Sequence, residues 1–247
     1  MFLVTGASSG IGHGTAAAFG QRGIDVLAVA RRVEPLRALA DTYGPHVHSL
    51  AADLSTPGGL DDLIEATAAF SRIDGVVHAA GSLIPVAPYA ELAGSELTSH
   101  FDVHVAAPIE INNRLGDRLH CARVLYIDSF SASALRVGWS QYSILKAAAQ
   151  MAARAAADEL QDTRIVRVFP GGVRTELVEA VLESSSQSPA VEAFREFDRA
   201  GELNEPADVG RFIARIALDA TDEALDQHES WDYGDPTAHN LLEARDM

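Results

Sequence analysis

The stretch Val4-Thr5-Gly6-Ala7-Ser8-Ser9-Gly10-Ile11-Gly12 decides the fold of this sequence. It joins a short apolar segment, 2–5, to an Ala-rich segment, 10–22, and spaces its glycines as G-x-x-x-G-x-G. Such glycines let the chain turn sharply and let its backbone approach a phosphate closely, while the N-terminus of the next helix supplies N–H donors. The stretch therefore predicts a strand, a phosphate-binding loop and a helix. An ordinary strand-to-helix turn is the alternative.

The rest of the chain repeats this order of elements. Short runs of Val, Ile and Leu alternate with Ala-rich segments of helical length, which predicts successive β-α-β units with parallel strands. We expect strands at 2–5, 24–30, 46–51, 73–79, 122–128, 163–169 and 229–233, and helices at 10–22, 33–43, 57–71, 91–115, 140–161 and 206–219. The predicted fold class is α/β, a Rossmann-type doubly wound parallel sheet of about seven strands with helices on both faces.

The domain organisation is predicted to be simple. No Pro/Gly/Ser-rich linker and no internal repeat divides the chain, so 1–247 is expected to form a single domain. The segment 176–204 interrupts the rhythm, with a polar run at 184–189 followed by Phe194 and Phe197. We expect a substrate lid in this segment.

The net charge and the cysteine content of the chain indicate which binding partners and which cellular location to expect. The formal net charge of −16 argues against nucleic acid and anionic membranes as partners. The chain starts without a basic n-region or a long apolar segment, so we expect no membrane span, and the single cysteine, Cys121, favours a cytoplasmic location. His100 and His104 are four residues apart, and His46 and His48 are also close, but neither pair has a third ligand, so we expect no metal site.

Three polar residues form a candidate catalytic set. Ser129 follows the strand predicted at 122–128, and thirteen residues later comes Tyr142, with Lys146 four positions beyond it on the same helix face. A phenol titrates at about pH 10 in water, so it exchanges protons at neutral pH only where a cation stabilises the phenolate. Lys146, the single lysine of the chain, is that cation. Ser129 is placed to donate a hydrogen bond to a carbonyl oxygen.

The end of the second predicted strand indicates the cofactor. Arg31 and Arg32 stand where a site for NAD usually has an acidic residue, about 20 residues beyond the glycine loop. An arginine pairs with a 2′-phosphate in a forked geometry, and His13 offers a second donor. NADP(H) is therefore favoured over NAD(H). The alternative is that both arginines are solvated at a helix start, with Glu34 pairing one of them.

The glycine loop, Ser129 and the Tyr142-x-x-x-Lys146 pair together resemble the short-chain dehydrogenase/reductase family, over nearly the whole chain. The resemblance implies that Tyr142 is the general acid/base, that Ser129 polarises the substrate, and that Lys146 assists Tyr142 and touches the nicotinamide ribose. It also implies a homodimer or homotetramer, formed through the helix that contains 147–157. The implied cofactor-binding residues are Gly6, Ser8, Ser9, Gly10, Ile11, Gly12, His13, Arg31, Arg32, Asp53, Leu54, Ala80, Gly81, Tyr142, Lys146, Pro170, Gly171, Val173 and Thr175.

Two histidines depart from the family pattern. His78 stands where the family usually has an asparagine, a change that we expect to be tolerated. His104 stands where many members have an asparagine that completes a proton relay, so it is a further candidate catalytic residue. A histidine there adds a group able to titrate near neutral pH. The alternative is a plain helix residue with no share in catalysis.

The substrate is expected to contact 82–85, 135–139 and 176–200, at the carboxyl ends of the strands. Arg136 in this set would bind an anionic substrate. The alternative is that Arg136 is a solvated charge on a loop. The leading hypothesis is an NADP(H)-dependent oxidoreductase that interconverts a small-molecule carbonyl and an alcohol. The alternatives are a catalytically weak or inactive NADP(H)-binding sensor or scaffold, against which the intact catalytic set argues, and an NAD-dependent alcohol dehydrogenase.

Overall fold

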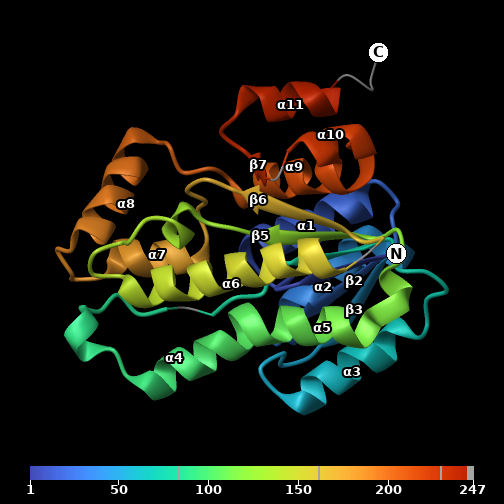
Figure 1. Cartoon of the computed structure of the whole chain (residues 1–247), viewed down its shortest axis with the longest axis horizontal. Helices are drawn as coiled ribbons and strands as arrows, with labels where there is room; N and C mark the ends of the chain where they lie inside the picture. The colour runs from blue at the N-terminus through green and yellow to red at the C-terminus, as the bar shows by residue number, and fades with distance from the viewer. Residues whose placement is uncertain (83, 161, 229, 244–247) are drawn as a thin grey trace.

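A parallel β-sheet forms the centre of the computed structural model, which describes residues 1–82, 84–160, 162–228 and 230–243 (Figure 1). Its strands are β1 (Phe2–Thr5), β2 (Val26–Ala30), β3 (Val47–Ala51), β4 (Gly75–His78), β5 (Arg123–Ile127), β6 (Arg164–Phe169) and β7 (Ser230–Asp232). They are arranged in the order β3-β2-β1-β4-β5-β6-β7, and every neighbouring pair is parallel. This is the doubly wound Rossmann arrangement, and the predicted fold class is confirmed.

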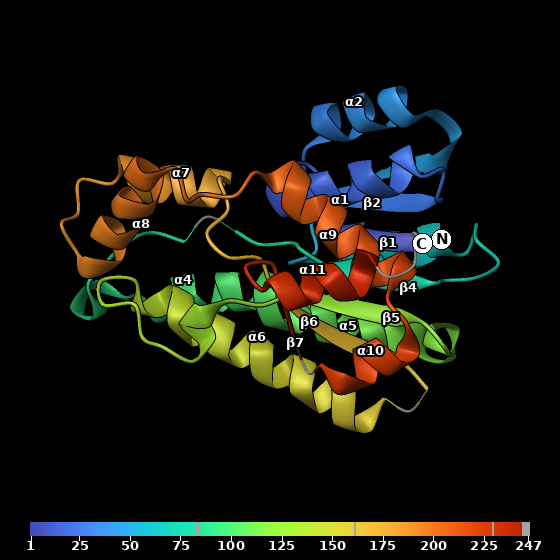
Figure 2. The same ribbon diagram turned by 90° about the horizontal axis from the view of Figure 1, so that it is seen from above.

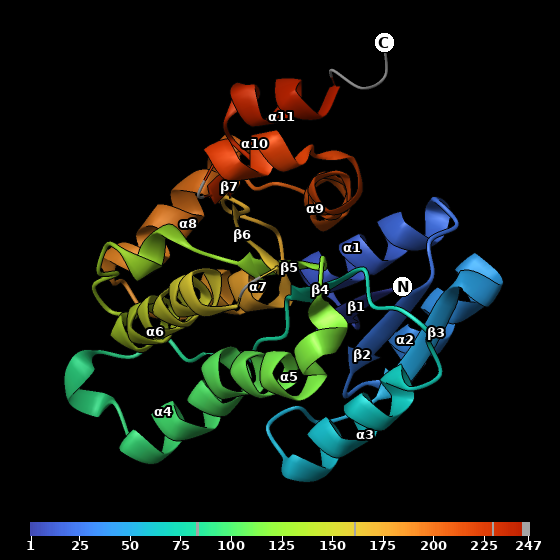
Figure 3. The ribbon, with the colours of Figure 1, turned by 45° about the vertical axis from the view of Figure 1, so that its right-hand side comes forward.

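Helices cover both faces of the sheet, as Figure 3 shows. One face packs against α1 (Gly10–Gln21), α2 (Val33–Tyr43), α9 (Pro206–Asp219), α10 (Asp222–Gln227) and α11 (Pro236–Glu243). The other face packs against α3 (Pro57–Thr67), α5 (Ala107–Leu115) and α6 (Ser140–Glu159). Phe2 and Val4 of β1 belong to the first core and Leu3 to the second, because successive side chains of a strand point to opposite faces.

The predicted helix at 91–115 is interrupted in the structure. It consists of α4 (Gly94–Phe101), a π-helical turn at Asp102–Ala106 and α5. Apolar spacing does not reveal such a turn, because the chain remains helical throughout. π-turns often occur at functional sites, and this one contains His104.

The segment 176–204 contains α7 (Glu176–Glu183) and α8 (Pro189–Ala200). Both helices lie beyond one end of the sheet in Figures 1 and 2, near α4 and the start of α6. Buried side chains of α7 and α8 form a third, small core with Ile84, Trp139 and Leu145. The lid function of this segment remains a prediction. None of the helices in the described ranges is long and apolar enough to cross a bilayer.

Two glycines let α1 pack closely against α9. A Cβ atom on Gly14 would lie 2.3 Å from the carbonyl oxygen of Pro206, and one on Gly210 would lie 2.2 Å from the carbonyl carbon of Gly14. Both distances are too short for any side chain. The helix that begins at the glycine loop is thus held in place by the backbone of α9.

Candidate active site

A cavity of about 1330 Å³ lies at the carboxyl ends of the strands. The glycine loop, the ends of β2, β4, β5 and β6, and the helices α6, α7 and α8 all contribute to its wall. Ser129, Tyr142, Lys146 and His104 line it. So do nearly all the predicted cofactor-binding residues: Gly6, Ser8, Ser9, Gly10, Ile11, Arg31, Arg32, Asp53, Leu54, Ala80, Gly81, Pro170, Gly171, Val173 and Thr175.

Gly12 and His13 of the predicted set are absent from this wall. Gly12 is buried inside the turn, where a Cβ atom would lie 2.5 Å from the carbonyl oxygen of Gly6. The Nδ1–H group of His13 donates to the carbonyl oxygen of Ala7 at 3.2 Å. Both residues therefore support the loop from within, and the cavity offers no support for His13 as a phosphate donor.

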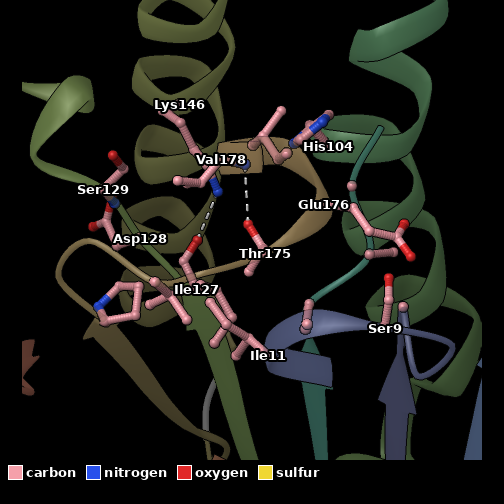
Figure 4. A pocket seen from close by; sticks show the side chains of 18 of the residues that line it. Ser9, Ile11, His104, Ile127, Asp128, Ser129, Lys146, Thr175, Glu176 and Val178 are labelled. Atoms are coloured by element: carbon pink, nitrogen blue, oxygen red, sulfur yellow. Dashed lines mark hydrogen bonds between the residues drawn. The ribbon is translucent and has the colours of Figure 1, made fainter. Parts of the chain in front are cut away.

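The glycines of the loop allow it to pack closely against its neighbours. Gly6 has a φ of +70°, and a Cβ atom there would lie 2.6 Å from the carbonyl oxygen of Ala79. Gly10 has a φ of +55°, and a Cβ atom there would lie 3.0 Å from the Thr175 methyl group. Thr175 in turn accepts a hydrogen bond from Val178 N and so begins α7 (Figure 4). Two helix N-termini thus meet at the loop, an arrangement that attracts an anion.

The two arginines after β2 differ in their contacts. Arg32 pairs with Glu176 at 2.7 Å and donates to the Ser8 hydroxyl at 3.2 Å, so its partner is Glu176 and not Glu34. Arg31 is exposed and forms no ion pair with any described residue. Its guanidinium is therefore available to an anionic ligand at this end of the cavity.

Asp53 lies near Arg31 at the same end. Its Oδ1 accepts hydrogen bonds from the hydroxyl and the backbone N–H of Ser55 at 2.7 and 3.0 Å. These bonds, aided by the positive charge of Arg31, lower the pKa of Asp53. Asp53 is therefore an ionised acceptor, suited to the amino group of a nucleobase.

Ser129, Tyr142 and Lys146 come together on one wall. Figure 4 shows Lys146 reaching from its helix to the Ile127 carbonyl, to which its Nζ donates at 2.9 Å. The same Nζ lies 5.9 Å from the centre of the Tyr142 ring, and that ring stacks on Trp139 at 4.2 Å. The Ser129 hydroxyl accepts from Ser131 N at 3.1 Å and keeps its own proton for another acceptor. The wall thus combines a phenol, an ammonium and a hydroxyl donor.

Asp128 supports this wall, although no sequence pattern points to it. Its buried carboxylate accepts from the backbone N–H of Ser129 at 2.7 Å, from Gln150 at 2.9 Å and from Arg167 at 3.0 Å. These bonds tie the end of β5 to α6 and β6. They fix the position of Ser129 relative to the helix that carries Tyr142 and Lys146.

His104 is buried and held in one tautomer. Its Nε2 accepts a hydrogen bond from Ser82 N at 3.1 Å, so the ring proton is on Nδ1. The Ser82 hydroxyl lies 3.3 Å from the same Nε2 and 2.5 Å from Nδ1 of His100. Burial, together with the charge of Lys146, lowers the pKa of His104 to about 3. The expectation that His104 titrates near neutral pH is therefore wrong, and the ring is neutral at neutral pH.

His78, the other departure, forms a buried hydrogen-bond chain. Its Nε2 donates to Asn112 Oδ1 at 3.0 Å, and Asn112 Nδ2 donates to the Tyr126 hydroxyl at 2.7 Å. Burial lowers the pKa of His78 to about 4 and raises that of Tyr126 to about 12. All three groups stay neutral and link α5 to strands β4 and β5.

His104→Asn is expected to change the acid sensitivity of the fold. The unfolded chain binds a proton at this histidine near pH 6.5, whereas the folded chain binds it only near pH 3. The free energy of unfolding of the wild type therefore falls below pH 6.5, by about 1.4 kcal/mol per pH unit from this group. The variant should lose less stability between pH 6.5 and 4.5, as measured by thermal melting.

The exposed His120 provides the control, because His120→Asn should keep the wild-type slope of melting temperature against pH. Equal slopes for His104→Asn and the wild type would contradict the buried, neutral state of His104.

The part of the cavity beyond Tyr142 is largely aromatic. Trp139 is fully buried, and Phe194 packs edge-on against it at 5.9 Å and against Phe197 at 6.5 Å. Leu177 and Arg136 complete this side of the wall. Of the segments expected to contact the substrate, 135–139 and 176–200 thus contribute side chains to the cavity wall, and the substrate contact itself stays a prediction.

The chain beyond the predicted lid also reaches the cavity, and no sequence pattern indicated this. Asn204 ends the predicted lid segment, whereas Asp232 ends β7, Gly234 and Asp235 follow it, and Pro236 begins α11. Nothing in their local sequence signals this position, because it depends on β7 pairing with β6. In the described ranges, no group of three or more His, Cys, Asp or Glu side chains is arranged to hold a metal ion.

Comparison with known proteins agrees with this geometry. The sequence model of the short chain dehydrogenase family matches residues 1–186. An uncharacterised oxidoreductase of Schizosaccharomyces pombe is 27% identical over 94% of this chain and 96% of its own length. The benzil reductase of Bacillus subtilis is 25% identical, over 94% and 97%.

Among solved structures, that of the KRED1-Pglu enzyme superposes with a TM-score of 0.85 at 28% identity, covering 91% of this chain and 97% of the other. The family match spans the glycine loop, the catalytic wall and the start of the lid segment. The protein is an oxidoreductase that belongs to the short-chain dehydrogenase family.

Proposed function

We propose that the protein is an NADP(H)-dependent oxidoreductase that interconverts a carbonyl compound and an alcohol. The observation that carries this proposal is the meeting of Ser129, Tyr142 and Lys146 on one wall of a cavity whose wall also contains Arg31, which forms no ion pair with any described residue. A cofactor that extends from Arg31 to Tyr142 would pass the glycine loop, where the N-terminus of α1 offers backbone N–H donors to its pyrophosphate.

Each residue of the wall has a part in the proton chemistry. Bound NADP(H) supplies or accepts the hydride. Tyr142 donates its phenolic proton to the carbonyl oxygen during reduction and recovers a proton afterwards. The Ser129 hydroxyl donates to the same oxygen, where negative charge develops. Lys146, fixed by the Ile127 carbonyl, keeps a positive charge beside the phenol and so favours the phenolate.

The cofactor is proposed to be NADP(H) because of the charge at the Arg31 end. A 2′-phosphate carries negative charge, and a guanidinium binds it through paired hydrogen bonds. Asp53 lies next to Arg31, and its Oδ1 already accepts two hydrogen bonds from Ser55. It is therefore not the acid expected to bind the ribose hydroxyls of NAD.

The aromatic side of the cavity supports a ketone with a bulky apolar or aromatic group. Trp139, Phe194 and Phe197 offer faces and edges against which such a group packs. The similarity to a benzil reductase is in line with this substrate class. α7 and α8, which carry Phe194 and Phe197, are proposed to close over the substrate as a lid.

We also propose a homodimer or homotetramer. Ile144 and Met151 on α6, Ile109 on α5 and Phe101 on α4 are large apolar side chains that are exposed in the single chain. A second copy that covered them would remove this apolar surface from water. Light scattering at several protein concentrations measures the oligomeric state, and a monomer throughout would refute the proposal.

NADPH oxidation by the purified protein tests the proposed function. Absorbance is followed with a panel of aromatic ketones, diketones, aldehydes and quinones, with NADH in parallel. Turnover with NADPH and a weak response to NADH are expected. Tight NADPH binding with no turnover of any panel member would favour the sensor, and a preference for NADH would favour an NAD-dependent dehydrogenase.

A further inference from the structure

Three arginines line the cavity, and they differ in whether a carboxylate neutralises them. Arg32 pairs with Glu176. Arg31 and Arg136 form no ion pair with any residue in the described part of the chain. Several other arginines of this chain, whose net charge is −16, pair with Asp or Glu. An unpaired arginine at each end of one cavity indicates two anionic positions in what the cavity binds.

Arg136 is held in place before any ligand arrives. Its backbone N–H donates to the Ser143 hydroxyl at 3.0 Å, and its carbonyl accepts from Trp139 N at 2.8 Å. Its Nε donates to the buried Ser131 hydroxyl at 3.4 Å. The two terminal nitrogens of the guanidinium have no partner among the described residues. A fixed loop with free, forked donors is suited to bind a planar anion.

The neighbours of Arg136 define where such an anion would lie. Arg136 is on the loop between Ser129 and Tyr142, so its guanidinium and the two groups expected to bind the carbonyl oxygen share one wall. Trp139, three residues further along the loop, carries the aromatic contacts with Tyr142 and Phe194. A substrate that has a carbonyl group, an apolar body and an anionic group would therefore contact all three parts of this wall.

We propose that Arg136 binds the carboxylate of the substrate, and that the preferred substrates are aromatic or bulky apolar keto acids. This inference rests on the proposed function, since it assigns the substrate class of the same site. The carboxylate forms paired hydrogen bonds with the terminal nitrogens of Arg136, while Ser129 and Tyr142 bind the ketone oxygen. The guanidinium takes no part in the hydride or proton transfer and acts in specificity alone.

Matched acids and esters test the proposal. Benzoylformate and 4-acetylbenzoate are each compared with their methyl esters, which keep the ring and the ketone and lose the charge. We expect the wild type to favour at least one acid over its ester by tenfold or more in kcat/KM. Arg136→Gln should lower that acid-to-ester ratio at least tenfold, and Arg136→Lys should restore part of it. A ratio that Arg136→Gln leaves unchanged would overturn the proposal.

Arg72→Gln is the matched control. It makes the same change in net charge, and Arg72 is exposed, pairs with Asp74 just before β4 and is absent from the cavity wall. The acid-to-ester ratio should stay at the wild-type value. An equal fall in this variant would show a general charge effect and refute a local role for Arg136.

Calorimetric titration with benzoate separates this proposal from the proposed function. Benzoate should bind to the NADPH-loaded wild type and to Arg72→Gln, and at least tenfold more weakly to Arg136→Gln, with benzamide as the uncharged control. This result would support the anion site even if no ketone were turned over, in which case the proposed function alone fails. Benzoate binding that is equal in the wild type and Arg136→Gln would overturn the site even in an active reductase.

Discussion

Tyr142→Phe should lower the turnover of carbonyl substrates by roughly 10²–10⁴-fold, the range of general acid–base catalysis. The substitution removes only the hydroxyl, so the ring keeps its stacking on Trp139 and the cavity keeps its shape. NADPH affinity should stay within about threefold of the wild type, because the phenol acts on the substrate proton and does not contact the phosphates. Steady-state kinetics and NADPH fluorescence titration measure the two quantities.

Tyr89→Phe serves as the control for this experiment. Tyr89 is 75% exposed and lies away from the cavity wall, so its variant should keep wild-type kinetics. Retained turnover in Tyr142→Phe would remove the tyrosine from the proton chemistry. A loss of both turnover and NADPH affinity would instead indicate a structural role.

Arg31→Asp should weaken NADPH binding by roughly 30- to 1000-fold, which corresponds to about 2–4 kcal/mol. The change removes the unpaired cation and places a second carboxylate near Asp53, which repels a 2′-phosphate. NADH lacks this phosphate, so its affinity should stay constant or improve. Titration of both cofactors against the wild type and the variant gives the ratio directly.

Arg199→Asp makes the same charge change on the exposed end of α8 and should alter neither affinity. Arg32→Gln is an informative comparison, because Arg32 already has Glu176 as a partner. If Arg31→Asp left NADPH binding intact while NADH bound more tightly to the wild type, the protein would be an NAD-dependent dehydrogenase.

The sheet and most helices could be predicted from local patterns, because strands buried on both faces form continuous apolar runs. The predictions at 2–5 and 33–43 agree with β1 and α2 at both ends. β7, at 230–232, was also expected, but its role in closing the cavity was not, since this depends on pairing with a strand about 60 residues earlier.

The catalytic wall could be predicted because Tyr142 and Lys146 are close in sequence and their spacing has a direct meaning on a helix. The burial of a side chain and contacts between residues far apart in sequence cannot be predicted from such local spacing. The titration of His104 was misjudged because its burial depends on the packing of the π-helical turn, and the partner of Arg32 proved to be 144 residues away. The anchoring of His13 to Ala7 likewise depends on how the loop folds over itself.

The close packing of Gly14 on Gly210 has a consequence for biosynthesis. The glycine loop is translated well before α9, which lies beyond the residues matched by the family model. While the chain is still emerging from the ribosome, α1 has no α9 to pack on, and one apolar face of the nascent sheet stays uncovered. The helix that begins at the glycine loop therefore reaches its final packing only after α9 has been synthesised.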